Sequence, residues 1–417
     1  MDEIKFTLPD ISEVEIKNVC EVLESGWITT GPKTKELEKK LAGSVGDYCG
    51  KGVPRCVCLG SATAALEICL RLLGVGSHFG GNSQDEVITC AYTYTASASV
   101  ISHVGAKIVL VDCSGAEGAI EMDYSKLEAA ITENTKAIIP VDVGGVPCNY
   151  DKIFEIVENK KNLFKASSKM QNALGRIAVI ADGAHALGAS YKGKMVGSIA
   201  DFTAFSFHAT KNFTTAEGGA ICWNHIDGIE DKEIYKQVQL FSLHGQSKDA
   251  FAKDQMRVWE YDIAGPWYKC NMTDVMAAIG LGQFDRYPGM LARRREIIEK
   301  YDAAFKVLGV KTLNHYSNEK ISSGHLYITR IPGISREKTN EIMKALMING
   351  ICSNVHFKPL PMHTAYKNLG FDIKDYPNSY AKFENEITLP LHTKLTDAQV
   401  EYVIKKYTEI VKEYQER

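Results

Sequence analysis

The chain has 417 residues, and its 48 lysines and arginines against 51 aspartates and glutamates give a formal net charge of −3, which excludes a strongly basic nucleic-acid-binding protein. Hydrophobic residues make up 45% and charged residues 24%, so a mostly disordered chain is excluded as well. The acidic N-terminus lacks the apolar core of a signal peptide, and no apolar run reaches the roughly 20 residues of a membrane span, so we expect a cytoplasmic protein without a membrane partner.

Short apolar runs alternate with amphipathic ones from residue 55 to residue 223. The predicted strands are Arg55–Leu59, Glu86–Cys90, Lys107–Asp112, Ala137–Val143, Ile177–Asp182, Phe202–Phe207 and Gly219–Trp223. The predicted helices between them are Ser61–Leu73, Thr95–His103, Tyr124–Ile131 and Asp151–Glu158. Nearly continuous apolar strands that alternate with helices indicate a mostly parallel sheet covered on both faces. We therefore predict an α/β fold, with the polar segment Asn159–Gly175 as a surface loop.

The pattern changes after residue 288. The predicted elements here are the helix Leu291–Leu308, the strand Ser323–Ile331, the helix Glu337–Asn349, the strand Ile351–Phe357 and the helix Asp397–Tyr414. This order suits a smaller α+β domain, so we predict a large domain at 1–288 and a small one at 289–417. Within the first of these helices, the charge run Arg293–Arg295 predicts a solvated face.

Eleven cysteines are scattered along the chain, and several, such as Cys69, Cys222 and Cys352, lie in apolar segments. This is typical of buried free thiols in a reducing compartment. Cys56 and Cys58 form a C-x-C in an apolar strand without a second cysteine or histidine cluster nearby. We interpret them as core thiols rather than zinc ligands.

Three features stand where predicted strands end, which is where doubly wound sheets bind ligands. Asp182 ends one strand, with His185 just beyond it; Lys211 follows another, and the turn 60–63 opens a helix. A helix N-terminus binds phosphate, a carboxylate holds a protonated pyridine nitrogen, and a lysine forms a Schiff base with an aldehyde. Taken singly, the turn 60–63 could be a helix cap, Asp182 a turn residue and Lys211 a solvated lysine. Together they indicate a pyridoxal phosphate site.

Four ordered blocks carry a resemblance to a known family. They are Glu24–Pro32 (ESGWITTGP), Ala181–Ala186 (ADGAHA), Phe205–Gly219 (FSFHATKNFTTAEGG) and Tyr268–Gly280 (YKCNMTDVMAAIG). The chain resembles the DegT/DnrJ/EryC/StrS sugar aminotransferases, a branch of the aspartate aminotransferase superfamily. The resemblance implies the pyridoxal-phosphate-dependent transferase fold of type I, with seven strands in the large domain and an α+β small domain.

The resemblance also implies roles for individual residues. Lys211 matches the Schiff-base lysine that shuttles protons, Asp182 the partner of the pyridine nitrogen, and His185 the residue beside the phenolic oxygen. The implied phosphate ligands are Ser61, Ala62, Thr63 and Ser206, and Tyr94 matches a ring stacked on the pyridine. Lys269 and Asn271 match a loop that reaches the phosphate of the partner subunit, where the family more often has asparagine and then arginine. Substrate contacts fall on Thr29, Thr30, His208 and His356. For His356 and its neighbour His363, around Pro359 and Pro361, an ordinary loop role stays open.

By resemblance, L-glutamate donates the amino group, and pyridoxal 5'-phosphate on Lys211 cycles through pyridoxamine phosphate. The acceptor is a keto nucleotide-linked deoxysugar, modified at C4 because the block around Lys211 has His-Ala-x-Lys-Asn, and the product serves surface polysaccharide, lipopolysaccharide or glycoconjugate synthesis. We expect a homodimer with shared active sites. The alternatives are a 3-keto sugar acceptor, a fold-type-I enzyme acting on amino acids, or a non-catalytic regulator. An arginine clamp would favour amino acids, and neither Arg330 nor Arg336 can be assigned to one.

Overall fold

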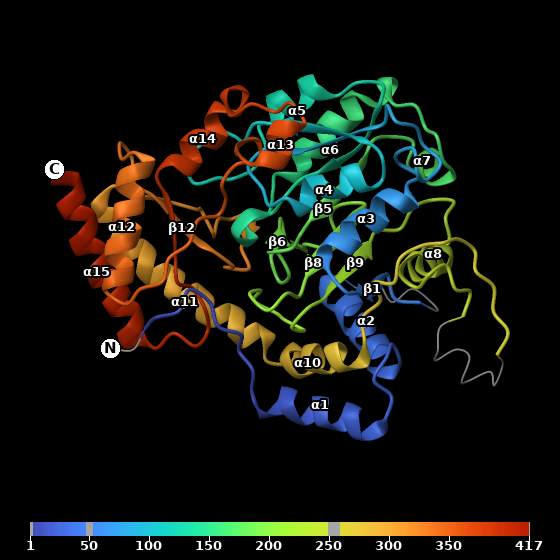
Figure 1. The fold of residues 1–417 in the computed structure, drawn as a ribbon, viewed down its shortest axis with the longest axis horizontal. Helices are drawn as coiled ribbons and strands as arrows, with labels where there is room; N and C mark the ends of the chain where they lie inside the picture. The colour runs from blue at the N-terminus through green and yellow to red at the C-terminus, as the bar shows by residue number, and fades with distance from the viewer. Residues whose placement is uncertain (1–2, 47–52, 249–258, 417) are drawn as a thin grey trace.

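The structure is a computed structural model that describes residues 3–46, 53–248 and 259–416 (Figure 1). Its largest sheet has seven strands, in the order β1 (Cys56–Leu59), β9 (Gly219–Trp223), β8 (Phe202–Ser206), β5 (Ala178–Asp182), β4 (Thr135–Ile139), β2 (Glu86–Cys90) and β3 (Lys107–Val111). Only β9 runs antiparallel to its neighbours, and all other pairs are parallel. The prediction of a mostly parallel seven-stranded sheet in an α/β fold is confirmed.

Helices cover both faces of this sheet, because successive side chains of a strand point to opposite faces. In β4, Ala137 and Ile139 belong to one apolar cluster and Ile138 belongs to another. The first cluster includes α3 (Ala62–Leu72), α4 (Ala96–His103), α7 (Lys169–Leu174) and α8 (Asp231–Ser242). The opposite face packs against α5 (Tyr124–Ala130) and α6 (Tyr150–Asn159), and further along against α2 (Pro32–Val45) and α10 (Asp274–Phe284). Outside them, α1 (Glu13–Ser25) packs on α10.

The C-terminal part has its own sheet and core, at the left of Figure 1. Three antiparallel strands, β10 (Lys311–Thr312), β12 (Tyr327–Arg330) and β13 (Glu386–Leu389), form this sheet. The helices are α11 (Tyr287–Phe305), α12 (Arg336–Ile348), α13 (Thr364–Asn368), α14 (Pro377–Glu384) and α15 (Asp397–Glu416). A third small sheet joins β6 (Ser190–Tyr191), β7 (Lys194–Met195) and β11 (Lys320–Ile321). Ile4, near the N-terminus, packs into the C-terminal core. The division at residue 288 stays a prediction.

One predicted strand is wrong. Ile351–Phe357 forms only isolated bridges, from Ile351 to Ile4 and from Asn354 to Thr388. The place beside β12 is taken instead by β13, whose four buried residues are too few to give a clear pattern. The segment therefore runs irregularly beside β13, the edge strand of the small sheet, with a single bridge to it. The neighbouring prediction Ser323–Ile331 shortens to β12.

Two surface predictions are also corrected. Asn159–Gly175 is not only a loop, because it contains α7, which Ser168 caps and which buries Met170 in the core. In the run Arg293–Arg295, the middle residue Arg294 is buried and donates hydrogen bonds to the carbonyl oxygens of Gly324 and Leu391. Only its two neighbours keep ion pairs near the surface.

The ten cysteines that the structure describes are free, and Cys49 lies outside the described residues. Cys56, Cys58, Cys69 and Cys222 are buried, as predicted, whereas Cys352 is half-buried. Within the described part of the chain, no helix has both the length and the apolar composition needed to cross a bilayer.

Candidate active site

The carboxyl ends of the parallel strands open into a cavity of about 540 Å³. Asp182 ends β5 and Ser206 ends β8, while β1 leads directly into the first turn of α3. Residues from the C-terminal part close the opposite side. Of the residues predicted for the site, the cavity is lined by Ser61, Ala62, Thr63, Tyr94, Asp182, His185, Ser206, His208, Lys211 and His356. The fold thus brings together segments that are nearly 300 positions apart in the sequence.

Lys211 stands in the connection between β8 and β9, which hydrogen bonds hold on both sides. Lys211 N–H donates to the carbonyl of His208 over 2.8 Å, and Asn212 Nδ2 donates to the carbonyl of Ser323 over 2.8 Å. Burial lowers the pKa of Lys211 to about 8, although the nearby Asp182 carboxylate opposes the change. A substantial fraction of this amine is therefore neutral near pH 7 to 8, as a nucleophile or proton acceptor requires.

Asp182 is buried at the end of β5, and two donors hold its carboxylate. Ser97 Oγ donates to Oδ2 over 2.7 Å, and the backbone N–H of Ala184 donates to Oδ1 over 3.2 Å. Ser97 is itself 2.9 Å from Thr93 Oγ1. Burial raises the pKa of the Asp182 carboxyl, and these hydrogen bonds together with Lys211 counteract the rise. Such a group is poised to accept a cationic ring nitrogen.

The N-terminus of α3 faces the cavity with Ser61, Ala62 and Thr63. Ser61 caps the helix through Oγ, which accepts from Ala64 N–H over 3.1 Å. First-turn amides have no partner within a helix, so with the helix dipole they attract an anion. The backbone of β9 approaches this turn closely, because a Cβ at Gly219 would lie 2.5 Å from the nitrogen of Ala62. Glycine at this position therefore allows the anion-binding turn to sit against the sheet.

Two histidines stand side by side near Lys211. The rings of His185 and His325 have centroids 4.3 Å apart. The backbone N–H of Gly144 donates to His185 Nδ1 over 3.2 Å. Burial and then the charge of Lys211 hold the pKa of His185 well below its usual range, and burial does the same for His325. Both rings are therefore neutral at physiological pH.

An aromatic group completes the wall. The Tyr94 side chain is 61% exposed and its ring centroid lies 6.1 Å from that of Phe357, which in turn stacks at 6.1 Å on His185. On the other side Phe6 stacks on His356 with centroids 5.5 Å apart. Burial lowers the pKa of His356 to about 3. Planar apolar faces thus border the cavity beside the polar groups of the strand ends.

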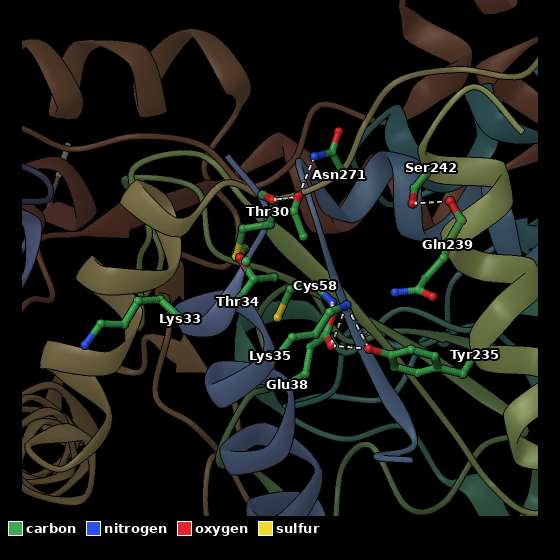
Figure 2. A network of polar contacts seen from close by, with 12 residues as sticks. Thr30, Lys33, Thr34, Lys35, Glu38, Cys58, Tyr235, Gln239, Ser242 and Asn271 are labelled. Carbon is green, nitrogen blue, oxygen red and sulfur yellow. Dashed lines mark hydrogen bonds and ion pairs between the residues drawn. The ribbon is translucent and has the colours of Figure 1, made fainter. Parts of the chain in front are cut away.

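Four predicted residues lie outside this cavity. Asn271 Nδ2 donates to Thr30 Oγ1, which donates to the carbonyl of Met272, both over 2.5 Å (Figure 2). Lys269 Nζ donates to Asn271 Oδ1 over 2.7 Å. Thr29 accepts from Asp274 N–H through its carbonyl. The loop around them lies beside a separate buried group, in which Glu38 accepts from Tyr235 Oη over 2.7 Å and from Cys58 N–H over 3.1 Å. Neither these four nor the exposed His363 line the cavity of their own chain.

The structure also adds cavity residues that the sequence did not predict. They include Phe6, Thr7, Thr93, Glu217, His325, Asn354 and Phe357, with Ser97 behind Asp182. Of these residues, only Glu217 lies in a sequence block that the family resemblance had singled out, the block that contains Lys211. His325 precedes a buried strand of the small sheet. The sequence pattern of that strand does not show how the small sheet packs against the large one, so it could not place His325 at the cavity.

Comparison with known proteins decides the family. The model of the DegT/DnrJ/EryC1/StrS aminotransferase family matches residues 9–408. This chain belongs to that family. It is 36% identical over 416 residues to the spore coat polysaccharide biosynthesis protein SpsC of Bacillus subtilis, covering 98% of this chain and 97% of that protein.

Solved structures agree with the fold. Spr1654 from Streptococcus pneumoniae, assigned as a sugar aminotransferase and solved in its PLP form, superposes with a TM-score of 0.92 at 54% identity, and 99% of each chain is covered. PseC from Helicobacter pylori, an aminotransferase in pseudoaminic acid biosynthesis, gives 0.83 at 26% identity over 99% of this chain and 100% of that one. The predicted resemblance and the transferase fold are confirmed.

Family membership also confirms the predicted cofactor, pyridoxal 5'-phosphate. The described residues fit it. The cavity offers an anion site at α3, a buried carboxylate without a cationic ring partner of its own, and a lysine whose pKa is lowered to about 8. Planar aromatic neighbours border the space between them.

Proposed function

We propose that this enzyme transfers the amino group of L-glutamate to a keto carbon, C4, of a nucleotide-linked deoxysugar. The observation that carries the proposal is the meeting of Lys211, Asp182 and the N-terminus of α3 in one cavity. Pyridoxal phosphate supplies an electron sink that stabilises negative charge on the carbon next to the amine. In our assignment Asp182 holds the pyridine nitrogen protonated, and the α3 turn with Ser206 binds the phosphate.

Lys211 is assigned two tasks. Its neutral amine forms the covalent link to the cofactor, and once released it moves a proton between the cofactor carbon and the substrate carbon. A pKa of about 8 places the amine near the pH at which it can both accept and return a proton. His185 donates to the cofactor's phenolic oxygen in this assignment, because its Nδ1 is occupied by Gly144 N–H.

The choice of a sugar over an amino acid as acceptor rests on the wall of the cavity. Among the described lining residues the wall has histidines, aromatic rings and Asn354, with no arginine to clamp a carboxylate. Arg336, considered for that role in the sequence, instead donates to the carbonyl oxygens of Phe383 and Glu386. Neutral imidazoles suit hydroxyl and carbonyl oxygens. The relatives support this choice, since SpsC is named for polysaccharide biosynthesis and Spr1654 is assigned as a sugar aminotransferase.

We also propose a homodimer in which Lys269 and Asn271 serve the partner's cofactor. Both lie outside the cavity of their own chain, and the neighbouring Tyr268 is 60% exposed. Trp259 and Ile263, which precede Tyr268 in the chain, are exposed as well, Trp259 to 84%. A surface of this composition is favourable to bury against a second copy.

The test is a coupled assay with L-[¹⁵N]glutamate and nucleotide-linked keto sugars. We expect ¹⁵N in the sugar product, 2-oxoglutarate in equal amount, and a 4-amino sugar by NMR. A 3-amino product would correct the position, and labelled amino acids without labelled sugar would overturn the proposal in favour of an amino-acid enzyme. Protein that binds the cofactor but transfers nothing to either class would point to the regulator.

A further inference from the structure

Three imidazoles surround Lys211, and the hydrogen bond behind each ring determines what its other nitrogen offers the cavity. For His185, Gly144 N–H donates to Nδ1, so the proton must be on Nε2. For His325, Nδ1 lies 2.9 Å from Asn212 Oδ1, and the Asn212 amide nitrogen is fixed by donation to Ser323. The His325 proton is therefore on Nδ1. One ring thus offers a donor and the other an acceptor.

The third ring, His356, is hydrogen-bonded to a hydroxyl group. Its Nδ1 is 3.0 Å from Thr388 Oγ1, and a hydroxyl can either donate or accept. Thr388 Oγ1 in turn shares a hydrogen bond with Glu386 Oε1. The other carboxyl oxygen, Oε2, accepts from the backbone N–H of His356 over 3.1 Å. Glu386, Thr388 and the ring therefore form a chain that ends at the cavity.

Glu386 is fully buried on β13, as is Thr388. The charged and titratable groups around it are Arg330 on β12, Arg336 on α12, Tyr92, Tyr407 on α15 and His356 itself. Arg336 donates to the backbone carbonyl of Glu386 rather than to its carboxyl. No cation of the described chain stands within ion-pairing distance of that carboxyl. A buried acid without an ion pair favours its neutral form.

We propose that Glu386 is a positioning residue that acts as a neutral acid and, through the Thr388 hydroxyl, holds the His356 proton on Nε2. The acid O–H donates to Thr388 Oγ, and the threonine O–H donates to His356 Nδ1. His356 Nε2 then carries an N–H that faces the cavity as a donor to an oxygen of the acceptor substrate. The contact with the substrate oxygen rests on the proposed function, whereas the position of the ring proton does not.

The arrangement has a pH dependence that follows from its direction. Burial raises the pKa of Glu386 to about 8, while the Thr388 hydroxyl, the backbone N–H of His356 and the two arginines oppose the rise. Below that pH the acid is neutral and donates. Above it, the carboxylate accepts from the Thr388 hydroxyl, whose oxygen then accepts from His356 Nδ1–H. The ring proton moves to Nδ1 through solvent exchange, and the cavity loses its donor.

The first measurement reads the proton directly. Histidine is ¹⁵N-labelled in the cofactor-loaded enzyme, His356 is assigned by comparison with His356→Gln, and its ring shifts are followed from pH 6 to pH 9.5. We expect the Nε2–H form at pH 7 and the Nδ1–H form above about pH 8. His315, which pairs with Ser322 away from the cavity, serves as internal control. A His356 tautomer that does not change with pH would overturn the proposal.

Variants separate positioning from packing. Glu386→Gln keeps a donor to Thr388 and an acceptor for the backbone N–H of His356. It should therefore hold the ring proton of His356 on Nε2 across the whole pH range. Thr388→Val removes the relay and should leave the tautomer mixed at pH 7. Thr329→Val removes an equally buried hydroxyl of the same sheet and should change nothing at His356. Equal behaviour of the two valine variants, or loss of Nε2–H in Glu386→Gln, would contradict the proposal.

Kinetics give a second readout. Because Lys211 titrates in the same range, the informative quantity is the difference between the pH profiles of variant and wild type. Relative to wild type, Glu386→Gln should retain more kcat/KM for the keto sugar above pH 8, and Thr388→Val should lose roughly tenfold at pH 7. An enzyme with the expected tautomers but no sugar transfer would refute the proposed function and leave Glu386 in its role. Variants with wild-type profiles and wild-type tautomers would refute the role of Glu386.

Discussion

One side of the cavity carries charged groups, and the other carries neutral polar groups. On the side of the large sheet stand charged groups, Asp182 and Lys211, close enough for each to influence the pKa of the other. On the side of the C-terminal part stand His325 and His356, both held neutral by burial, with a buried acid behind one of them. In the proposed function, the charged side would hold the cofactor, and the side with neutral, directional hydrogen bonds would hold the sugar.

This difference has a physical reason. A charge that stabilises a developing charge is most effective when it is fixed in a dry site. Sugar hydroxyls and carbonyls carry no net charge, so an ion on their side would be costly to bury and would select less well than a donor or acceptor in a fixed direction. The comparison predicts large, pH-dependent effects for variants on the sheet side and smaller ones on the other side.

The largest effect is expected for Lys211→Ala. Removal of the only lysine that lines the described cavity should reduce turnover by roughly 10³-fold or more, because both the covalent link and the proton transfer are lost. Borohydride reduction followed by intact-mass measurement should add the cofactor mass to wild type and not to the variant. A folded variant that retains turnover and the covalent cofactor would show that another residue performs these tasks.

Asp182→Asn should follow, with a loss of roughly 10²-fold in transamination and little change in folding. The amide cannot stabilise a protonated ring nitrogen, so the cofactor becomes a weaker electron sink. The loss should be seen in both half-reactions, with glutamate and with the keto acceptor. Stopped-flow absorbance of each half-reaction measures this, and near wild-type rates would remove Asp182 from the proposed role.

Ser97→Ala should cost about tenfold and move the pH profile. Burial raises the pKa of Asp182 and the Ser97 hydrogen bond opposes this, so its removal raises that pKa further. In the proposed role of Asp182, activity needs the carboxylate and is lost as pH falls through its pKa, so the acid limb should shift to higher pH. Two controls sharpen the comparison: the exposed Ser102→Ala on the same helix should have no effect, and His325→Gln should lower activity without moving the acid limb. An unmoved limb in Ser97→Ala would show that Asp182 does not set it.

The sheet side of the site could be predicted from the sequence because each of its parts is local. Asp182 directly ends an apolar strand, and Lys211 lies in a contiguous block, so chain neighbours imply spatial neighbours. The other side depends on how the small sheet packs against the large one. The wrong strand at Ile351–Phe357 and the missed β13 hid the fact that His356 and Glu386 meet. The burial of Arg294 and the place of His325 depend on the same long-range packing.

The last prediction concerns Lys269 and Asn271, which belong to neither side of their own cavity. If each subunit lends this loop to its partner, a C2 dimer contains two composite sites. Lys211→Ala inactivates its own site, and a double substitution of Lys269 and Asn271 by alanine impairs the partner's. In a mixed dimer one site collects both defects and the other collects none. Random exchange forms such dimers in about half of the population, so about a quarter of wild-type activity should return. Mass spectrometry of isotope-labelled subunits confirms that exchange has occurred. Exchange without recovered activity would place the loop in its own subunit's site or outside catalysis altogether, and the charged side of the cavity would then be complete within one chain.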